Sequence, residues 1–342
     1  ADINNALLAI SSNNSGSSAP STNYASQFFA NTSASMMQLN NTSGNAFINL
    51  FTLAGAPAFP LDGTINSINI GKGTNSVSGN TVLGEGALDA TVSGGNNTAI
   101  GKDALTTLTS GTNNVAVGSE SLDANTTGSK NTAIGHQSLS ANNTGTDNSA
   151  VGAFSLLANT TGSNNIAFGQ GSLEANTTGG SNTALGLGAL KTNTTASDNT
   201  AVGKSALTLN TTGTFLTAVG SQSLDANTTG TRNTAIGYQS ASAITTGGSN
   251  VAVGSFALLA TTTADNNVSI GHTSMEANTT GGSNTACGSG ALGANTTASN
   301  NTAVGRSALA ANTTGTQNVA VGGNALDANT TANNNTALGY NS

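Results

Sequence analysis

Apolar and polar positions repeat along this chain with a period of 17 residues. A glycine returns at every seventeenth position from Gly84 to Gly339, sixteen times without a skip. The residue before each of these glycines is apolar, the residue two before is almost always Ala, and the residue four before is Asn except at Leu216. Fixed positions within a varying repeat are typical of a solenoid. We call each 17-residue unit a coil and its repeated glycine the coil glycine.

The residues before the coil glycine alternate as in a β-strand. A Thr, Val, Ile or Ser and the large apolar residue share one face, and Asn, Ala and Gly share the other. We expect the β-branched and large apolar face to point inward and the second face to be flat and small. A coil is too short for two strands and a crossover helix, so each strand should stack on its equivalents. The pattern predicts an all-β, parallel β-solenoid of sixteen coils, about 75 Å long at ~4.8 Å per coil.

The second half of each coil carries a leucine four residues after the coil glycine, with Met275 and Ala241 as exceptions. Phe154 occurs with Leu157, and Phe256 with Leu259, so two positions three apart become apolar together. This spacing favours a single helical turn in each coil, and a second strand stays open as the alternative.

Seven coils then contain Asn-Thr-Thr-Gly, as at Asn125 to Gly128, and most others carry a close variant, which is typical of turns. The Asn-Thr-Thr part of this motif also matches the N-glycosylation pattern. A glycan on every coil would crowd the stack, so we interpret them as turn chemistry.

Composition narrows the classes of function. The chain has a net charge of −7 and no basic cluster, which argues against nucleic-acid binding. It has no run of 18 apolar residues that could span a membrane, and its first residues lack a secretory pattern. Each coil supplies only about two large apolar residues, so asparagine ladders or other chains should stabilise the thin interior.

Residues with reactive side chains are few and scattered. Cys287 takes the apolar position before a coil glycine, so we expect a small buried hydrophobe. His136 and His272 follow coil glycines eight coils apart, about 38 Å, so we expect them to be exposed and not to share a metal within one chain. A ring of one histidine from each of several chains stays open.

Carboxylates form no catalytic pair. Asp123, Asp225 and Asp327 share one coil position but lie six coils apart, whereas glycosidases need two carboxylates facing each other. We therefore expect no catalytic, cofactor or metal site and no enzymatic activity.

One coil departs from the repeat in two places. Ala241 replaces the coil leucine, and Ile244 replaces the following Asn. We expect the isoleucine to refill the volume that the alanine leaves, so Ala241→Leu alone should overpack the coil.

Residues 1–63 do not follow the repeat. Apolar clusters at Tyr24–Phe29, Met36–Leu39 and Phe47–Leu53 predict three short strands, too small a unit to be stable alone. Residues 64–83 should form an irregular lead-in that caps the first coil, ahead of the repeats at 84–342.

Two segments carry a resemblance to known families. Ser15 to Ala30, with Met36 to Leu39 and Asn45 to Leu50, resembles a small β module near the N-terminus of bacteriophage tail fibre proteins. The repeat, for example Asn131 to Leu139, resembles phage fibre repeats and the β-roll heads of trimeric autotransporter adhesins.

The resemblance implies a virion fibre, a homotrimer that acts as spacer and adhesin in host-surface attachment and is assembled in the host cytoplasm. Residues 1–63 would attach to a virion baseplate or tail protein, and the rod would reach toward a host surface receptor. We expect the flat face, such as Asn199, Ala201 and Gly203, to pack along the symmetry axis. Candidate surface contacts are Phe154, Leu157, Tyr238, Phe256 and Leu259.

Other classes stay open. A bacterial surface adhesin would share the solenoid, and an ice-binding solenoid would need a flat array of Thr. For ice, the Thr pair of Asn-Thr-Thr-Gly is the better candidate, since the strand Thr interchanges with Val and Ile. The sequence stops in mid-coil after Tyr340, and continuation of the native chain past Ser342 to a tip or chaperone domain stays open.

Overall fold

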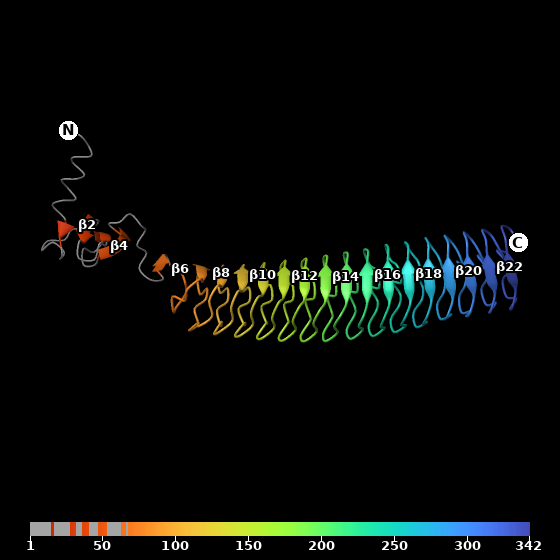
Figure 1. Cartoon of the computed structure of the whole chain (residues 1–342), viewed down its shortest axis with the longest axis horizontal. Helices are drawn as coiled ribbons and strands as arrows, with labels where there is room; N and C mark the ends of the chain where they lie inside the picture. Colours follow the sequence, from red (N-terminus) through yellow and green to blue (C-terminus); the bar gives the residue numbers. More distant parts are fainter. Residues whose placement is uncertain (1–14, 17–27, 32–35, 41–46, 53–62, 66–67) are drawn as a thin grey trace, which may run out of the picture.

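The computed structural model describes residues 15–16, 28–31, 36–40, 47–52, 63–65 and 68–342 (Figure 1). A four-stranded sheet contains β1 (Ser15–Gly16), β2 (Phe28–Asn31), β3 (Met36–Asn40) and β4 (Phe47–Thr52). β1 and β2 are parallel, and β2, β3 and β4 pair antiparallel in that order. Two predicted strands thus correspond to β3 and β4, while Tyr24 lies outside the described residues.

The lead-in to the repeats is antiparallel. β5 (Gly63–Ile65) pairs with β6 (Ile68–Gly71), which pairs with β7 (Thr81–Gly84), the first strand of the repeat. The strand direction then stays constant along the rod.

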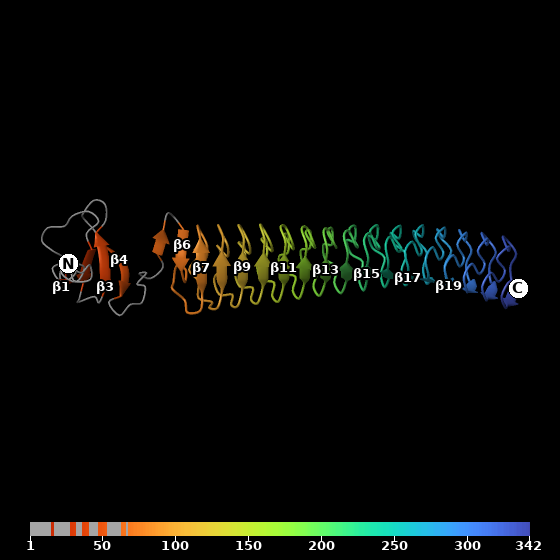
Figure 2. The same cartoon turned by 90° about the horizontal axis from the view of Figure 1, so that it is seen from above.

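The predicted parallel β-solenoid is confirmed (Figures 1 and 2). Each strand pairs in register with the strand 17 residues later, as in Thr132↔Ser149 and Ala133↔Ala150. Within residues 68–342, sixteen parallel strands delimit fifteen turns of the solenoid. The strands are β7, β8 (Thr98–Ile100), β9 (Val115–Val117), β10 (Thr132–Ile134), β11 (Ser149–Val151), β12 (Ile166–Phe168), β13 (Thr183–Leu185), β14 (Thr200–Val202), β15 (Thr217–Val219), β16 (Thr234–Ile236), β17 (Val251–Val253), β18 (Val268–Ile270), β19 (Thr285–Cys287), β20 (Thr302–Val304), β21 (Val319–Val321) and β22 (Thr336–Leu338).

The two strand faces are opposite to the expectation. The Asn and Ala columns point inward, and Asn199 and Ala201 are both buried. The large apolar residues before the coil glycines point outward, as Ile134 and Leu185 do. In most coils the narrow interior already holds one fully buried leucine, such as Leu190, so only a small residue fits opposite it. The prediction that the Asn-Ala-Gly face forms a surface on a symmetry axis was therefore wrong.

The leucine segment is neither a helical turn nor a strand. Its leucines adopt left-handed backbone conformations, with φ of 52° at Leu105 and 51° at Leu122. The Leu105 N–H donates to the Ser121 carbonyl of the next coil at 3.1 Å, along the rod and not within its own turn. A left-handed residue costs roughly 1–2 kcal/mol. Full burial of the leucine side chain and the bond to the next coil offset that cost.

The coil glycine is required by close backbone approach. Gly203 has φ of +135°, and a Cβ built there would lie 2.5 Å from the Gly220 carbonyl oxygen. The same contact recurs from coil to coil, so no larger residue fits this column.

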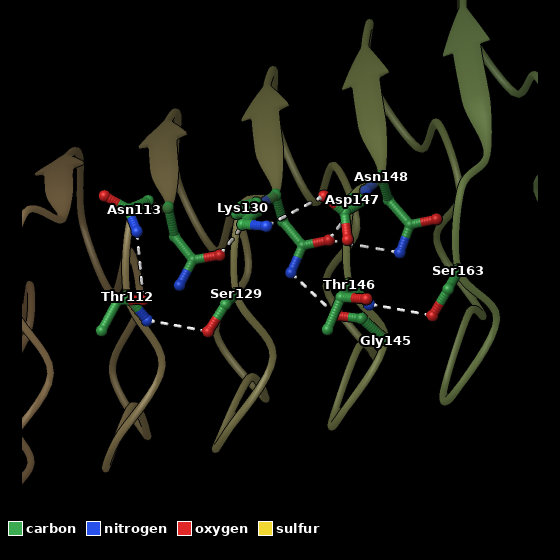
Figure 3. A network of polar contacts seen from close by, with 11 residues as sticks. Thr112, Asn113, Ser129, Lys130, Gly145, Thr146, Asp147, Asn148 and Ser163 are labelled. Atoms are coloured by element: carbon green, nitrogen blue, oxygen red, sulfur yellow. Dashed lines mark hydrogen bonds and ion pairs between the residues drawn. The ribbon is translucent and has the colours of Figure 1, made fainter.

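Two asparagine ladders run through the interior. In the first, four residues before the coil glycine, the Asn131 N–H donates to Asn114 Oδ1 at 3.0 Å, and Asn131 Nδ2 donates to the Gly145 carbonyl at 2.8 Å. Figure 3 labels Gly145 and the next asparagine of this ladder, Asn148. In the second, Asn142 Nδ2 donates to Asn125 Oδ1 at 2.9 Å and to the same Gly145 carbonyl at 3.1 Å. These bonds satisfy buried amides that would otherwise destabilise the fold.

Candidate interaction surfaces

The outward face of the sheet carries two columns that we call the outer columns. One contains the large apolar residue before each coil glycine, and the other contains the Thr, Val, Ile or Ser two residues earlier. Leu185 is 45% exposed and Ile236 is 40% exposed. Over sixteen strands the outer columns cover roughly 75 Å by 10 Å. The column before the coil glycines is apolar throughout, while Thr or Ser occupies eleven of the sixteen positions of the other column. An apolar row of this length on the surface is a feature of interaction sites.

Cys287 belongs to the outer columns. Its side chain is exposed, so the expectation of a buried hydrophobe was wrong. The reason is that the residue before each coil glycine points outward and not into the core.

The candidate contact residues lie on a second face, next to the end of each strand. Phe154 and Phe256 are the second residues after their coil glycines, and Leu157 and Leu259 are the fifth. All four are half-buried, while Tyr238 is 46% exposed. We call this surface the side face.

Aromatic rings on the side face pack edge to face across neighbouring coils. The centroids of His136 and Phe154 are 5.3 Å apart, those of Tyr238 and Phe256 are 5.4 Å apart, and those of Phe256 and His272 are 6.0 Å apart. Both histidines are exposed, as expected, and each contacts a phenylalanine. These contacts hold the rings in fixed orientations.

Between the two phenylalanine–leucine pairs the side face is hollowed. One hollow of ≈ 390 Å³ extends from Phe154 to Thr208, and a second of ≈ 490 Å³ extends from Ser205 to Ala243. Both are lined by Ser205 and Thr208, so they are continuous. We call the combined depression the side groove. Sequence reasoning found Phe154 but missed the groove, whose signal is the glycine pair Gly171 and Gly188 in the column of Phe154.

The side groove contains three charged groups. Lys191 Nζ lies 3.3 Å from Glu174 Oε2, which neutralises that carboxylate. Burial raises the pKa of the Asp225 carboxyl above its usual value. At the same coil position, but outside the groove, burial also raises the pKa of Asp123, and a Ser140 hydrogen bond partly opposes that shift.

No group of three or more His, Cys, Asp or Glu that could hold a metal occurs among the described residues. Within the same residues, no helix has the length and hydropathy needed to cross a bilayer. Asp123 and Asp225 are kept apart by the six intervening coils and do not form a pair.

Comparisons with known proteins supply no relative: no protein-family profile matches the chain, and no curated protein matches its sequence.

Proposed function

We propose that this chain is the shaft of a homotrimeric virion fibre, such as a phage tail fibre, acting as a spacer and adhesin in attachment to a host surface. It has no enzymatic role in this proposal. Residues 1–63 connect the shaft to a baseplate or tail protein.

The observation that carries the proposal is the continuous row of large apolar side chains in the outer columns, one before each coil glycine. In water, such a surface favours association, because covering it removes apolar area from solvent. Specific interfaces bury about 800 Å² per partner, close to the roughly 750 Å² estimated from the strand spacing. Three copies around one axis would cover the outer columns along the whole rod. The outer columns, and not the inward Asn-Ala-Gly face, are then the surface on which the three chains pack.

The rod supports the spacer role. Its cross-section is one coil, and its length grows by one strand spacing, ~4.8 Å, per repeat. Each coil bonds only to its neighbours, so coils can be added without redesigning a core. Three rods held together would also present three copies of any surface contact, which increases avidity.

Sedimentation equilibrium without denaturant tests the trimer. The single chain has a mass of 33.1 kDa, and we expect three times that value. The double variant Leu185→Lys/Ile236→Lys places charges in the outer columns and should dissociate the assembly. Leu187→Lys/Leu209→Lys is the matched control, since these leucines are 48% and 49% exposed but lie off the sheet. A monomeric wild type, or equal dissociation of both variants, contradicts the proposal.

The virion role has its own test. Antibodies against residues 84–342 should label fibres on purified particles and reduce adsorption to host cells. Labelling of the bacterial envelope instead would favour a cell-surface adhesin.

A second candidate, ice binding, is favoured by one observation. The Thr column of the strands faces outward, and Thr183, Thr200, Thr217 and Thr234 follow one another in adjacent coils with register kept by the sheet. A regular flat array of hydroxyl and methyl groups could match an ice surface. Thermal hysteresis that is lost in Thr200→Leu/Thr217→Leu would support this function, and no hysteresis would exclude it.

A further inference from the structure

We propose that the side groove binds a neutral, linear polysaccharide, which lies parallel to the rod axis. The proposal names a receptor class for the adhesin, and its biological role rests on the proposed function. Binding itself depends only on the surface of the single chain.

The shape of the groove suits an extended polymer. Its lining residues come from six successive coils, from Phe154 to Ala243. At ~4.8 Å per coil the groove is about 24 Å long. Phe154 lines one end of it, and Phe256 and Leu259 come one coil after its other end. A chain of sugar units fits this length and direction, whereas a compact metabolite would leave most of it empty.

Gly171 and Gly188 create the depth of the groove, and the backbone does not require glycine there. Gly188 has φ of +63°, and a Cβ built on it meets no atom within 4 Å. Residues with side chains adopt the same conformation in this column, with φ of 60° at Phe154 and 59° at Ser205. Gly188 therefore keeps space open on the side face, whereas a Cβ on Gly171 would lie 2.9 Å from Glu174 Oε2, the end of a flexible side chain. The coil glycines differ from both, because a backbone contact imposes them.

The chemistry of the lining matches a sugar. Phe154 offers an apolar ring that is oriented by His136, and the C–H faces of pyranose rings pack on such rings. Gln170 and Gln222 carry both donors and acceptors, as sugar hydroxyls do. Ser205 and Thr208 add hydroxyls where the two hollows meet.

Charge selects a neutral polymer. Lys191 already pairs with Glu174, so it is not free to bind a carboxylate or sulfate. Asp225 adds an acidic group that would repel polyanions. An acidic polysaccharide therefore meets net negative charge along the groove.

The test is calorimetric titration of the purified chain with cellohexaose, mannohexaose and chitohexaose, and with hexagalacturonate as the acidic comparison. At least one neutral hexasaccharide should bind with a Kd below about 1 mM, and hexagalacturonate should bind more weakly. Gly188→Phe should weaken binding at least about tenfold by filling the groove.

Gly290→Phe is the matched control. Gly290 is the second residue after its coil glycine and has φ of +67°, but it lies three coils beyond the groove. Binding should be unchanged in this variant, and the two variants should share the same thermal transition, because both place a side chain on a left-handed backbone. Phe154→Ala should also weaken binding.

No binding of any neutral hexasaccharide, stronger binding of hexagalacturonate, or equal binding by the two glycine variants overturns the proposal. Sedimentation of the same samples separates it from the fibre proposal. If the chain is a trimer that binds no sugar, only the proposal of a sugar-binding groove is contradicted. If the chain is a monomer that binds sugar, only the proposal of a trimeric shaft is contradicted.

Discussion

Asn227 and Ile244 occupy the same position in successive coils, and their succession leaves the buried Oδ1 of Asn227 without a hydrogen-bond partner. Elsewhere in the second ladder that oxygen accepts from the next asparagine, as Asn125 Oδ1 does from Asn142 at 2.9 Å. Isoleucine has no amide to donate. Ala241 and Ile244 are both buried in the core, in line with the expected exchange of volume between them.

Ala241→Leu alone should lower stability by about 1–3 kcal/mol, because the leucine would compete with Ile244 for the same space. Ala241→Leu/Ile244→Asn restores the common coil and gives Asn227 Oδ1 a donor. The new amide oxygen at position 244 would face Thr261, whose hydroxyl already donates to the Asn278 carbonyl at 3.0 Å, so the double variant should recover stability close to that of the wild type. Chemical denaturation measures both. A single variant as stable as the wild type would contradict the compensation.

Asn165→Leu should destabilise the rod by about 1–3 kcal/mol for each buried group that it leaves unpaired. Asn165 Oδ1 accepts from the Asn182 N–H at 3.0 Å, and its Nδ2 donates to the Gly179 carbonyl at 2.9 Å. Leucine fits the position, as Leu216 shows in another coil, so the variant tests the hydrogen bonds and not the volume. Asn164→Leu is the control, since that exposed position holds Phe215 elsewhere. Equal thermal transitions for the two variants would argue against a stabilising role of the ladder.

Gly186→Ala and Gly188→Ala should differ strongly although they lie in one coil. At Gly186 the backbone has φ of +139° and the new Cβ would lie 2.5 Å from the Gly203 carbonyl oxygen, so we expect a loss of at least about 3 kcal/mol. At Gly188 the new methyl meets open space, and the loss should be limited to the roughly 1–2 kcal/mol of a left-handed residue. Thermal melting of the two variants gives the comparison, and similar values would mean that the backbone contact does not restrict the coil glycine.

Asp225→Asn should raise the melting temperature at pH 7. Burial disfavours the carboxylate, so the pKa of Asp225 is higher in the folded state than in the unfolded state. The charged form therefore reduces stability above both pKa values, and this loss disappears as the pH falls below the unfolded value. The advantage of the variant should shrink at acidic pH. Asp327→Asn, at the same coil position but exposed, should show no such trend.

The sequence predicts the coil period, the strand positions and the parallel stacking, because these depend on regular spacing alone. It also points to the asparagine ladders. The direction of the strand faces was misjudged because large apolar residues usually point inward. In most coils a buried leucine already fills the narrow interior, so the inward strand position holds a residue as small as alanine, as Ala133 and Leu139 show.

Other features left weaker signals in the sequence. The left-handed conformation of Leu105 depends on a hydrogen bond to the next coil, which no local pattern reveals. The side groove depends on Gly171 and Gly188, which look like ordinary turn glycines in the sequence. Only the structure shows that the space around Gly188 is open.

The burial of the asparagines in Asn-Thr-Thr-Gly bears on how the protein can be produced. Asn125 is fully buried, and its Nδ2 donates to the Gly128 carbonyl at 2.9 Å. N-linked glycans are attached to that same nitrogen. In a eukaryotic secretory pathway, a glycan added before the coil closes would occupy the interior of the rod. Recombinant chain should therefore be recovered folded from a bacterial cytoplasm and lost to misfolding in a glycosylating host.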